Sequence, residues 1–156
     1  MRMVPVLVVA MLTFSSLAAT PAAASDKADV LAVVTHYSHA FNRGDTKGAI
    51  ADCAPQVSII DDFAPHIWQG PTACADWLAA LAVYEKQEGI SGDVLTLSKK
   101  PWQVVVTGDR AYVVVPTTYT YLQRGKSVVE ANSVWTFALQ KLSANWRITA
   151  WAWAQH

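Results

Sequence analysis

Charged residues are scarce in this chain, and neither sign is in excess. Lys, Arg, Asp and Glu make up 15% of the 156 residues, with 12 basic against 12 acidic side chains, and 53% of the residues are hydrophobic. This composition argues against a disordered chain, which needs low hydrophobicity and high net charge. It also argues against nucleic-acid binding, which needs a basic excess to neutralise phosphates. We therefore expect one folded domain and no nucleic-acid partner.

Several motifs that mark nucleotide, redox or nucleophilic chemistry are missing. The sequence has no G-x-S-x-G, P-loop, G-x-G-x-x-G or H-E-x-x-H pattern. His36 and His39 have a spacing that suits a metal, but at about 100° per residue both lie outside the apolar stripe of their helix. We therefore expect no metal site and no cofactor, and we expect both histidines to be solvated.

A long apolar run occurs only at the N-terminus. Arg2 precedes an apolar segment over residues 4–17, and Ala22 and Ala24 suit a small-residue cleavage site. We predict a signal peptide over residues 1–24 and a mature domain over residues 25–156, periplasmic or secreted, with no membrane contact after cleavage. The alternative is a retained anchor helix, although the run is short for a span of about 20 residues.

Cysteine is limited to Cys53 and Cys74. In an oxidising compartment such a pair can form a disulfide, which would close a loop of about 20 residues and add about 3 kcal/mol. Two separate buried thiols are the alternative, because cysteine often behaves as a small hydrophobe. The sequence leaves both possibilities open.

The remaining chain is predicted as helices followed by strands, which is typical of an α+β fold. Asp26 can cap a helix that starts near residue 27 and stops at Gly44, and Asp45 can cap a second one that ends at Pro55. A third helix opens at residues 70–72 and closes at Gly89. The β-patterned segments are residues 57–62, 66–68, 93–98, 103–107, 111–122, 127–142 and 146–154.

Four stretches resemble the SnoaL-like / NTF2-like family. They are Phe-Asn-Arg-Gly-Asp at 41–45, Ile-Ile-Asp-Asp at 59–62 followed by Gly70, Gly-Asp-Arg-Ala-Tyr-Val at 108–113, and Trp-Arg-Ile at 146–148. The resemblance implies a cone in which three N-terminal helices pack on a curved, mostly antiparallel sheet around a pocket. It also implies a homodimer, because the outer sheet face is often a dimer interface in that family.

Two residues match the ketosteroid-isomerase-like branch of that family. Tyr37 stands eight residues before Asp45, and Asp61 stands nine residues before Gly70, as the branch's helix Tyr and base Asp do. The branch's oxyanion-hole Asp has no counterpart, because Ser133 or Trp135 stands at its place. That departure argues against steroid isomerisation.

The candidate catalytic residues are Asp61, Tyr37 and His66, and each has a structural alternative. A carboxylate at the mouth of an apolar pocket would have a raised pKa and could act as general base, but Asp61 could instead accept from turn amides. Tyr37 could donate to an oxyanion or simply be a core tyrosine. His66 could exchange a proton with Asp61 or be an exposed loop histidine.

Aromatic side chains gather in the last two predicted strands. Trp151 and Trp153 alternate with alanines, so one face of the strand is aromatic. That face is either a ligand wall or helix-facing core. We predict ligand contacts from Phe41, Ile59, Trp68, Trp77, Trp135, Trp151 and Trp153. Glu130 and Asn132 are predicted on the opposite face, toward a dimer surface or solvent, unless a bulge shifts the register.

Three functions fit these patterns. The first is an exported pocket protein that binds a small hydrophobic molecule. The second is a cofactor-free acid/base enzyme, an isomerase, lyase or hydrolase, with Asp61 as general base and Tyr37 as electrophile. The weakest is a structural dimerisation domain. Fold alone does not decide among them.

Overall fold

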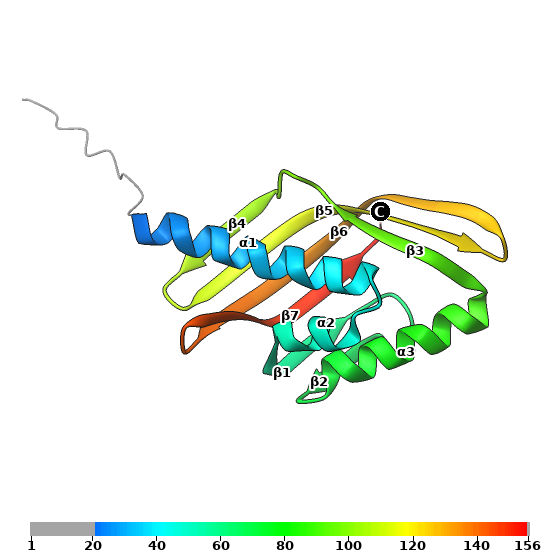
Figure 1. The fold of residues 1–156 in the computed structure, drawn as a ribbon, viewed down its shortest axis with the longest axis horizontal. Coiled ribbons are helices and arrows are strands. Elements are labelled where there is room, and N and C mark those ends of the chain that lie inside the picture. The colour runs from blue at the N-terminus through cyan, green and yellow to red at the C-terminus, as the bar shows by residue number, and fades with distance from the viewer. Residues whose placement is uncertain (1–20, 156) are drawn as a thin grey trace, which may run out of the picture.

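Three helices lie on one face of a seven-stranded sheet in the computed structural model, which describes residues 21–155 (Figure 1). The apolar run of the predicted signal peptide lies outside the described residues. Within them, no helix is both long and apolar enough to cross a membrane. The helices are α1 (Pro21–Asn42), α2 (Thr46–Asp52) and α3 (Ala73–Glu88). The strands are β1 (Cys53–Ile60), β2 (Ile67–Gly70), β3 (Ile90–Leu97), β4 (Gln103–Thr107), β5 (Arg110–Gln123), β6 (Lys126–Leu142) and β7 (Asn145–Ala154).

The sheet is open, curved and mostly antiparallel. Its strand order is β2-β1-β7-β6-β5-β3, and β4 also pairs with β5. The pairing of β1 with β7 is parallel, whereas the other pairs are antiparallel. Strands β4 and β3 occupy successive halves of one edge of β5. This architecture confirms the predicted α+β fold with three helices on a curved sheet.

The helix ends follow local sequence signals, with two corrections. Asp45 caps α2 by accepting from the Gly48 amide at 2.8 Å, and Gly89 ends α3 with a positive φ of 68°. The predicted start of the first helix was wrong: α1 begins at Pro21, and Asp26 lies inside it. The predicted end of the second helix was also wrong, because Pro55 lies in β1, where the pairing with β7 is irregular and needs no amide donor.

Asp26 has a long-range partner instead of a capping role. Its Oδ1 accepts from Lys141 Nζ at 2.7 Å and from Trp146 Nε1 at 3.3 Å. These donors flank the turn between β6 and β7, so Asp26 ties α1 to that end of the sheet. The Lys141 hydrogen bond is the main reason why the pKa of Asp26 is lowered.

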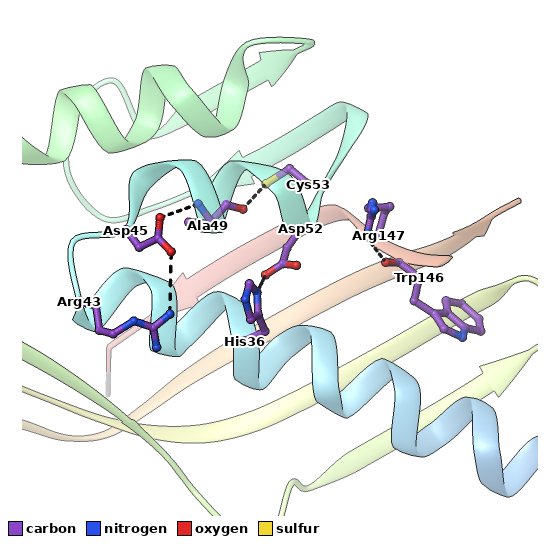
Figure 2. A network of polar contacts seen from close by, with 9 residues as sticks. His36, Arg43, Asp45, Ala49, Asp52, Cys53, Trp146 and Arg147 are labelled. Atoms are coloured by element: carbon purple, nitrogen blue, oxygen red, sulfur yellow. Dashed lines mark hydrogen bonds and ion pairs between the residues drawn. The ribbon is translucent and has the colours of Figure 1, made fainter. Parts of the chain in front are cut away.

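A disulfide and a polar pair hold the helices to each other and to β1. Cys53, which starts β1, is bonded to Cys74 in α3, with a Cα–Cα distance of 6.7 Å. His36 Nδ1 lies 2.6 Å from Asp52 Oδ2, which joins α1 to α2 (Figure 2). His36 is therefore paired as well as partly solvated, because 54% of its side chain is exposed against 11% for Asp52. Burial raises the pKa of Asp52, and the hydrogen bond to His36 opposes that shift.

A bulge in β6 reverses the facing of one end of that strand. Thr117 pairs with Ser133 and Tyr119 pairs with Glu130, so two residues of β6 oppose one of β5. Asn132, inside the bulge, has a positive φ of 67°, which asparagine tolerates better than most residues. The prediction that Glu130 points away from the helices was therefore wrong, because the extra residue turns it toward them.

Candidate functional site

A cavity of about 320 Å³ opens between α3, the end of α1 and the helix-covered face of the sheet. This volume is at the small end of the range for ligand pockets, roughly 300–1,000 Å³, so it admits a small organic molecule. Its wall combines apolar, aromatic and acidic side chains: Phe41, Asp61, Asp62, Phe63, Trp77, Leu81, Tyr84, Glu85, Ile90, Leu95, Tyr119, Tyr121, Glu130, Trp135, Trp151, Trp153 and Gln155.

Tryptophans from α3, β6 and β7 form much of this wall. The ring of Trp151 stands edge-on to Trp77 at 4.7 Å and to Trp135 at 5.5 Å between centroids. The ladder register places Trp135 opposite Trp153, so period-two alternation puts these rings on one side of the sheet. Such edge-to-face packing fixes the rings in place and gives the cavity a defined shape.

Five of the seven residues predicted to contact a ligand line this cavity: Phe41, Trp77, Trp135, Trp151 and Trp153. The other two lie behind its wall. Ile59 is fully buried in the core between β1 and the helices. Trp68 packs on Phe63 with ring centroids 5.0 Å apart, and Phe63 rather than Trp68 lines the cavity.

Asp61 directly follows β1 and lines the cavity with 9% of its surface exposed. Its Oδ2 accepts from the indole nitrogen of Trp77, and its Oδ1 from the amide of Asp62, both at 2.8 Å. Burial raises the pKa of Asp61 to about 7, and the two hydrogen bonds oppose that shift. Both protonation states are therefore populated near neutral pH, which suits a group that takes and returns a proton.

Tyr37 lies beneath the wall of the cavity rather than in it. The side chain is fully buried, its ring stands edge-on to Trp135 at 5.6 Å, and burial raises its pKa. Its hydroxyl and the indole nitrogens of Trp135 and Trp151 are buried without a hydrogen-bond partner among the described residues. Trp135 packs against both Tyr37 and Trp151, so these three side chains lie close together, and one of them is the predicted electrophile.

His66 contacts the backbone of Asp61. It sits in the exposed loop before β2, where its Nδ1 is 3.3 Å from the backbone oxygen of Asp61. It is not among the residues that line the cavity in the described part of the chain. This placement agrees with the alternative of an exposed loop histidine, and the role of His66 in proton transfer stays a prediction.

Sequence reasoning missed the acidic and tyrosine part of the wall. Tyr121 donates its hydroxyl to Glu130 Oε1 at 2.8 Å. Burial, with the nearby charge of Asp93, raises the pKa of Glu85 to about 7. Glu85 could have been found, because it follows Trp77 by eight residues and therefore shares its helix face. Glu130 could not, because its facing depends on the bulge.

Comparisons with known proteins identify the fold. No protein-family model matches the chain, and no curated protein matches it. A ketosteroid isomerase-like protein from Erwinia carotovora atroseptica is 22% identical, with a TM-score of 0.67 over 83% of this chain and 95% of that one. An NTF2-like protein with a cystatin-like fold from Novosphingobium aromaticivorans is 16% identical, with a TM-score of 0.67 over 85% and 82%.

The chain has an NTF2-like fold. At these identities the likeness extends to the fold and not to the chemistry. A fold alone does not fix a function, so the function depends on the side chains of the cavity.

Proposed function

We propose that this NTF2-like protein is a cofactor-free acid/base enzyme that acts on a small molecule held in the cavity, with Asp61 as general base. The observation that carries the proposal is the state of Asp61. It is buried in an aromatic cavity, its pKa is raised to about 7, and two N–H donors fix its oxygens. A protein that only binds a hydrophobic molecule does not need such a group.

The proposed reaction begins with proton transfer from carbon. Ionised Asp61 takes a proton from a C–H bond next to a carbonyl, and the electron pair of that bond moves to the carbonyl oxygen. Trp135 and Trp151 line the cavity and have unpartnered indole N–H groups, which would stabilise the charge on that oxygen, whereas Tyr37 does not line the cavity. Return of the proton to another carbon gives an isomer, and loss of a neighbouring leaving group gives a lyase product.

A nitrobenzisoxazole tests this proposal, because its ring opens when a base removes one proton and the coloured product is easily followed. Asp61→Asn keeps the shape of the side chain but not its basicity. We expect at least a hundredfold loss of turnover, since general bases contribute about 10²–10⁴-fold. Asp29→Asn, at an exposed position on α1, is the matched control. Equal turnover of the two variants would overturn the proposal.

We also propose that the chain is exported and forms a homodimer. The N-terminal apolar run and the Cys53–Cys74 disulfide support export into an oxidising compartment. Native mass spectrometry of protein from its own host tests both points. We expect twice the mass of residues 25–156. A protein that begins at Met1 would contradict cleavage, and a monomer mass at micromolar concentration would contradict the dimer.

A further inference from the structure

The wall of the cavity carries charge of one sign only. Asp61, Asp62, Glu85 and Glu130 line it, and no Lys, Arg or His is among its lining residues in the part of the chain that the structure describes. The whole sequence, in contrast, balances 12 basic against 12 acidic residues. The acidic bias is thus a property of the cavity and not of the chain.

Glu130 adds an independent sign that a donor is missing. Its Oε1 accepts from Tyr121, whereas its Oε2 is buried and has no partner among residues 21–155. A buried carboxylate oxygen without a donor is costly, because it has lost water and gained nothing in return. A ligand with a charged N–H or ammonium group at this place would satisfy it.

Aromatic rings line the cavity together with Glu130. The rings of Tyr119 and Tyr121 lie 5.1 Å apart, and Tyr119 stands edge-on to Trp153 at 6.2 Å between centroids. Tyr84 of α3 also lines the wall. The faces of such rings attract cations, and the attraction strengthens when water is excluded.

We propose that the cavity selects an organic cation, with an apolar body among the tryptophans and an amine or ammonium group directed at Glu130 and Glu85. The inference deepens the proposed function, because it names the class of substrate on which Asp61 would act. The binding preference itself requires no turnover. An anion of the same size would meet acidic side chains and no compensating positive charge.

Three naphthalene probes of similar size test the preference. Naphthylmethylamine is a cation near neutral pH, naphthylmethanol is neutral and naphthylacetate is an anion, and none of them reacts with a carboxylate base. Tryptophans line the cavity, so quenching of their fluorescence measures binding, with calorimetry as a second readout. We expect the amine to bind about tenfold tighter than the alcohol, which corresponds to about 1.4 kcal/mol, and the anion to bind weakest.

Variants that remove one charge from the cavity wall test which residues cause the preference for the amine. Glu130→Gln and Glu85→Gln are each expected to lower the ratio of amine to alcohol affinity. Glu88→Gln is the matched control, because Glu88 lies on α3 outside this cavity and faces Arg124 at 3.6 Å. Equal affinity for amine and alcohol in the unaltered protein would overturn the inference. The inference would also be overturned if Glu130→Gln and Glu85→Gln left the ratio of amine to alcohol affinity unchanged.

These outcomes are separate from those of the turnover assay. If the cation preference fails while Asp61-dependent ring opening persists, the inference is wrong and the proposed function stands. If the preference holds while Asp61→Asn leaves turnover unchanged, the cavity is a cation-binding site and the acid/base function is wrong.

Discussion

The indole N–H of Trp77 donates to Oδ2 of Asp61 over 2.8 Å, so a side chain of α3 holds the carboxylate that ends β1. This buried hydrogen bond favours the ionised form of Asp61 and so lowers its pKa, whereas burial of the carboxyl group raises it. Trp77 therefore lowers the pH at which Asp61 can act as a base, relative to burial alone, besides shaping the wall.

Trp77→Phe is expected to raise the pKa of Asp61 and to move the pH profile of turnover upward. A hydrogen bond to a charged group contributes about 1.5–3 kcal/mol, which corresponds to a midpoint about one to two pH units higher. The profile of kcat/KM against pH measures this. Trp102→Phe is the control, because Trp102 is 66% exposed and lies outside the cavity. An unmoved midpoint in Trp77→Phe would show that the bond does not tune the base.

The raised pKa of Asp61 also predicts how stability depends on pH. The folded value of about 7 exceeds the ordinary value of 3.8, so between these values the folded state binds more protons than the unfolded state. The free energy of unfolding contributed by this group therefore falls as pH rises through that window and levels off above it. In Asp61→Asn the side chain at this position does not titrate, so this contribution to the free energy of unfolding does not change with pH.

Urea unfolding at about pH 5 and about pH 8 measures the difference between the two proteins. We expect the unaltered protein to lose about 3 kcal/mol relative to Asp61→Asn between these pH values, since pH 5 lies about two units below the folded pKa and one pKa unit corresponds to about 1.36 kcal/mol. Asp29→Asn should follow the unaltered protein. A constant difference between unaltered protein and Asp61→Asn would mean that Asp61 has an ordinary pKa.

The disulfide predicts a stability that depends on redox conditions. Cys53 and Cys74 are 21 positions apart, and closing such a loop restricts the unfolded chain by about 3 kcal/mol. Reductant, or the double change Cys53→Ala with Cys74→Ala, should lower the midpoint of thermal unfolding. Reductant should have no further effect on the double variant. If reductant does not change the thermal unfolding midpoint of the unaltered protein, the Cys53–Cys74 disulfide is contradicted.

The His36–Asp52 pair predicts an asymmetric response to substitution. Removing His36 leaves a buried carboxylate without its partner, whereas removing Asp52 leaves a half-exposed histidine that water can solvate. We expect His36→Ala to cost about 1–3 kcal/mol of unfolding free energy and Asp52→Ala to cost less. His39→Ala, at an exposed position on the same helix, should stay within about 0.5 kcal/mol of the unaltered protein. Equal losses for His36→Ala and His39→Ala would contradict the pairing.

Local signals carried most of the fold prediction. Asp45 and Gly89 act through groups within one helical turn, so their capping roles are readable from neighbouring residues. The Gly108-Asp109 turn fixes β4 against β5 in the same way. Tryptophans at alternate positions of β7 share a face because the strand has period two, and that face lines the cavity.

Features that depend on distant partners were not readable. Asp26 looks like a helix cap in sequence, and only the turn between β6 and β7 reveals its partners, Lys141 and Trp146. Asp52 lies sixteen residues from His36, so no local rule pairs them. The facing of Glu130 depends on how β6 pairs with β5, which no periodicity in β6 itself records.

The bulge at Asn132 decides whether Glu130 of β6 faces the cavity. If β6 instead paired one-to-one with β5 beyond the Thr117–Ser133 pair, Ala131 rather than Glu130 would lie opposite Tyr119, and Glu130 would face the opposite side of the sheet while Trp135 stayed in place. The one extra residue of β6 therefore places a carboxylate in the cavity, although β5 runs past it in regular register. Asn132 is not among the residues that line the cavity in the described part of the chain, yet the bulge that contains it determines the charge of the cavity wall.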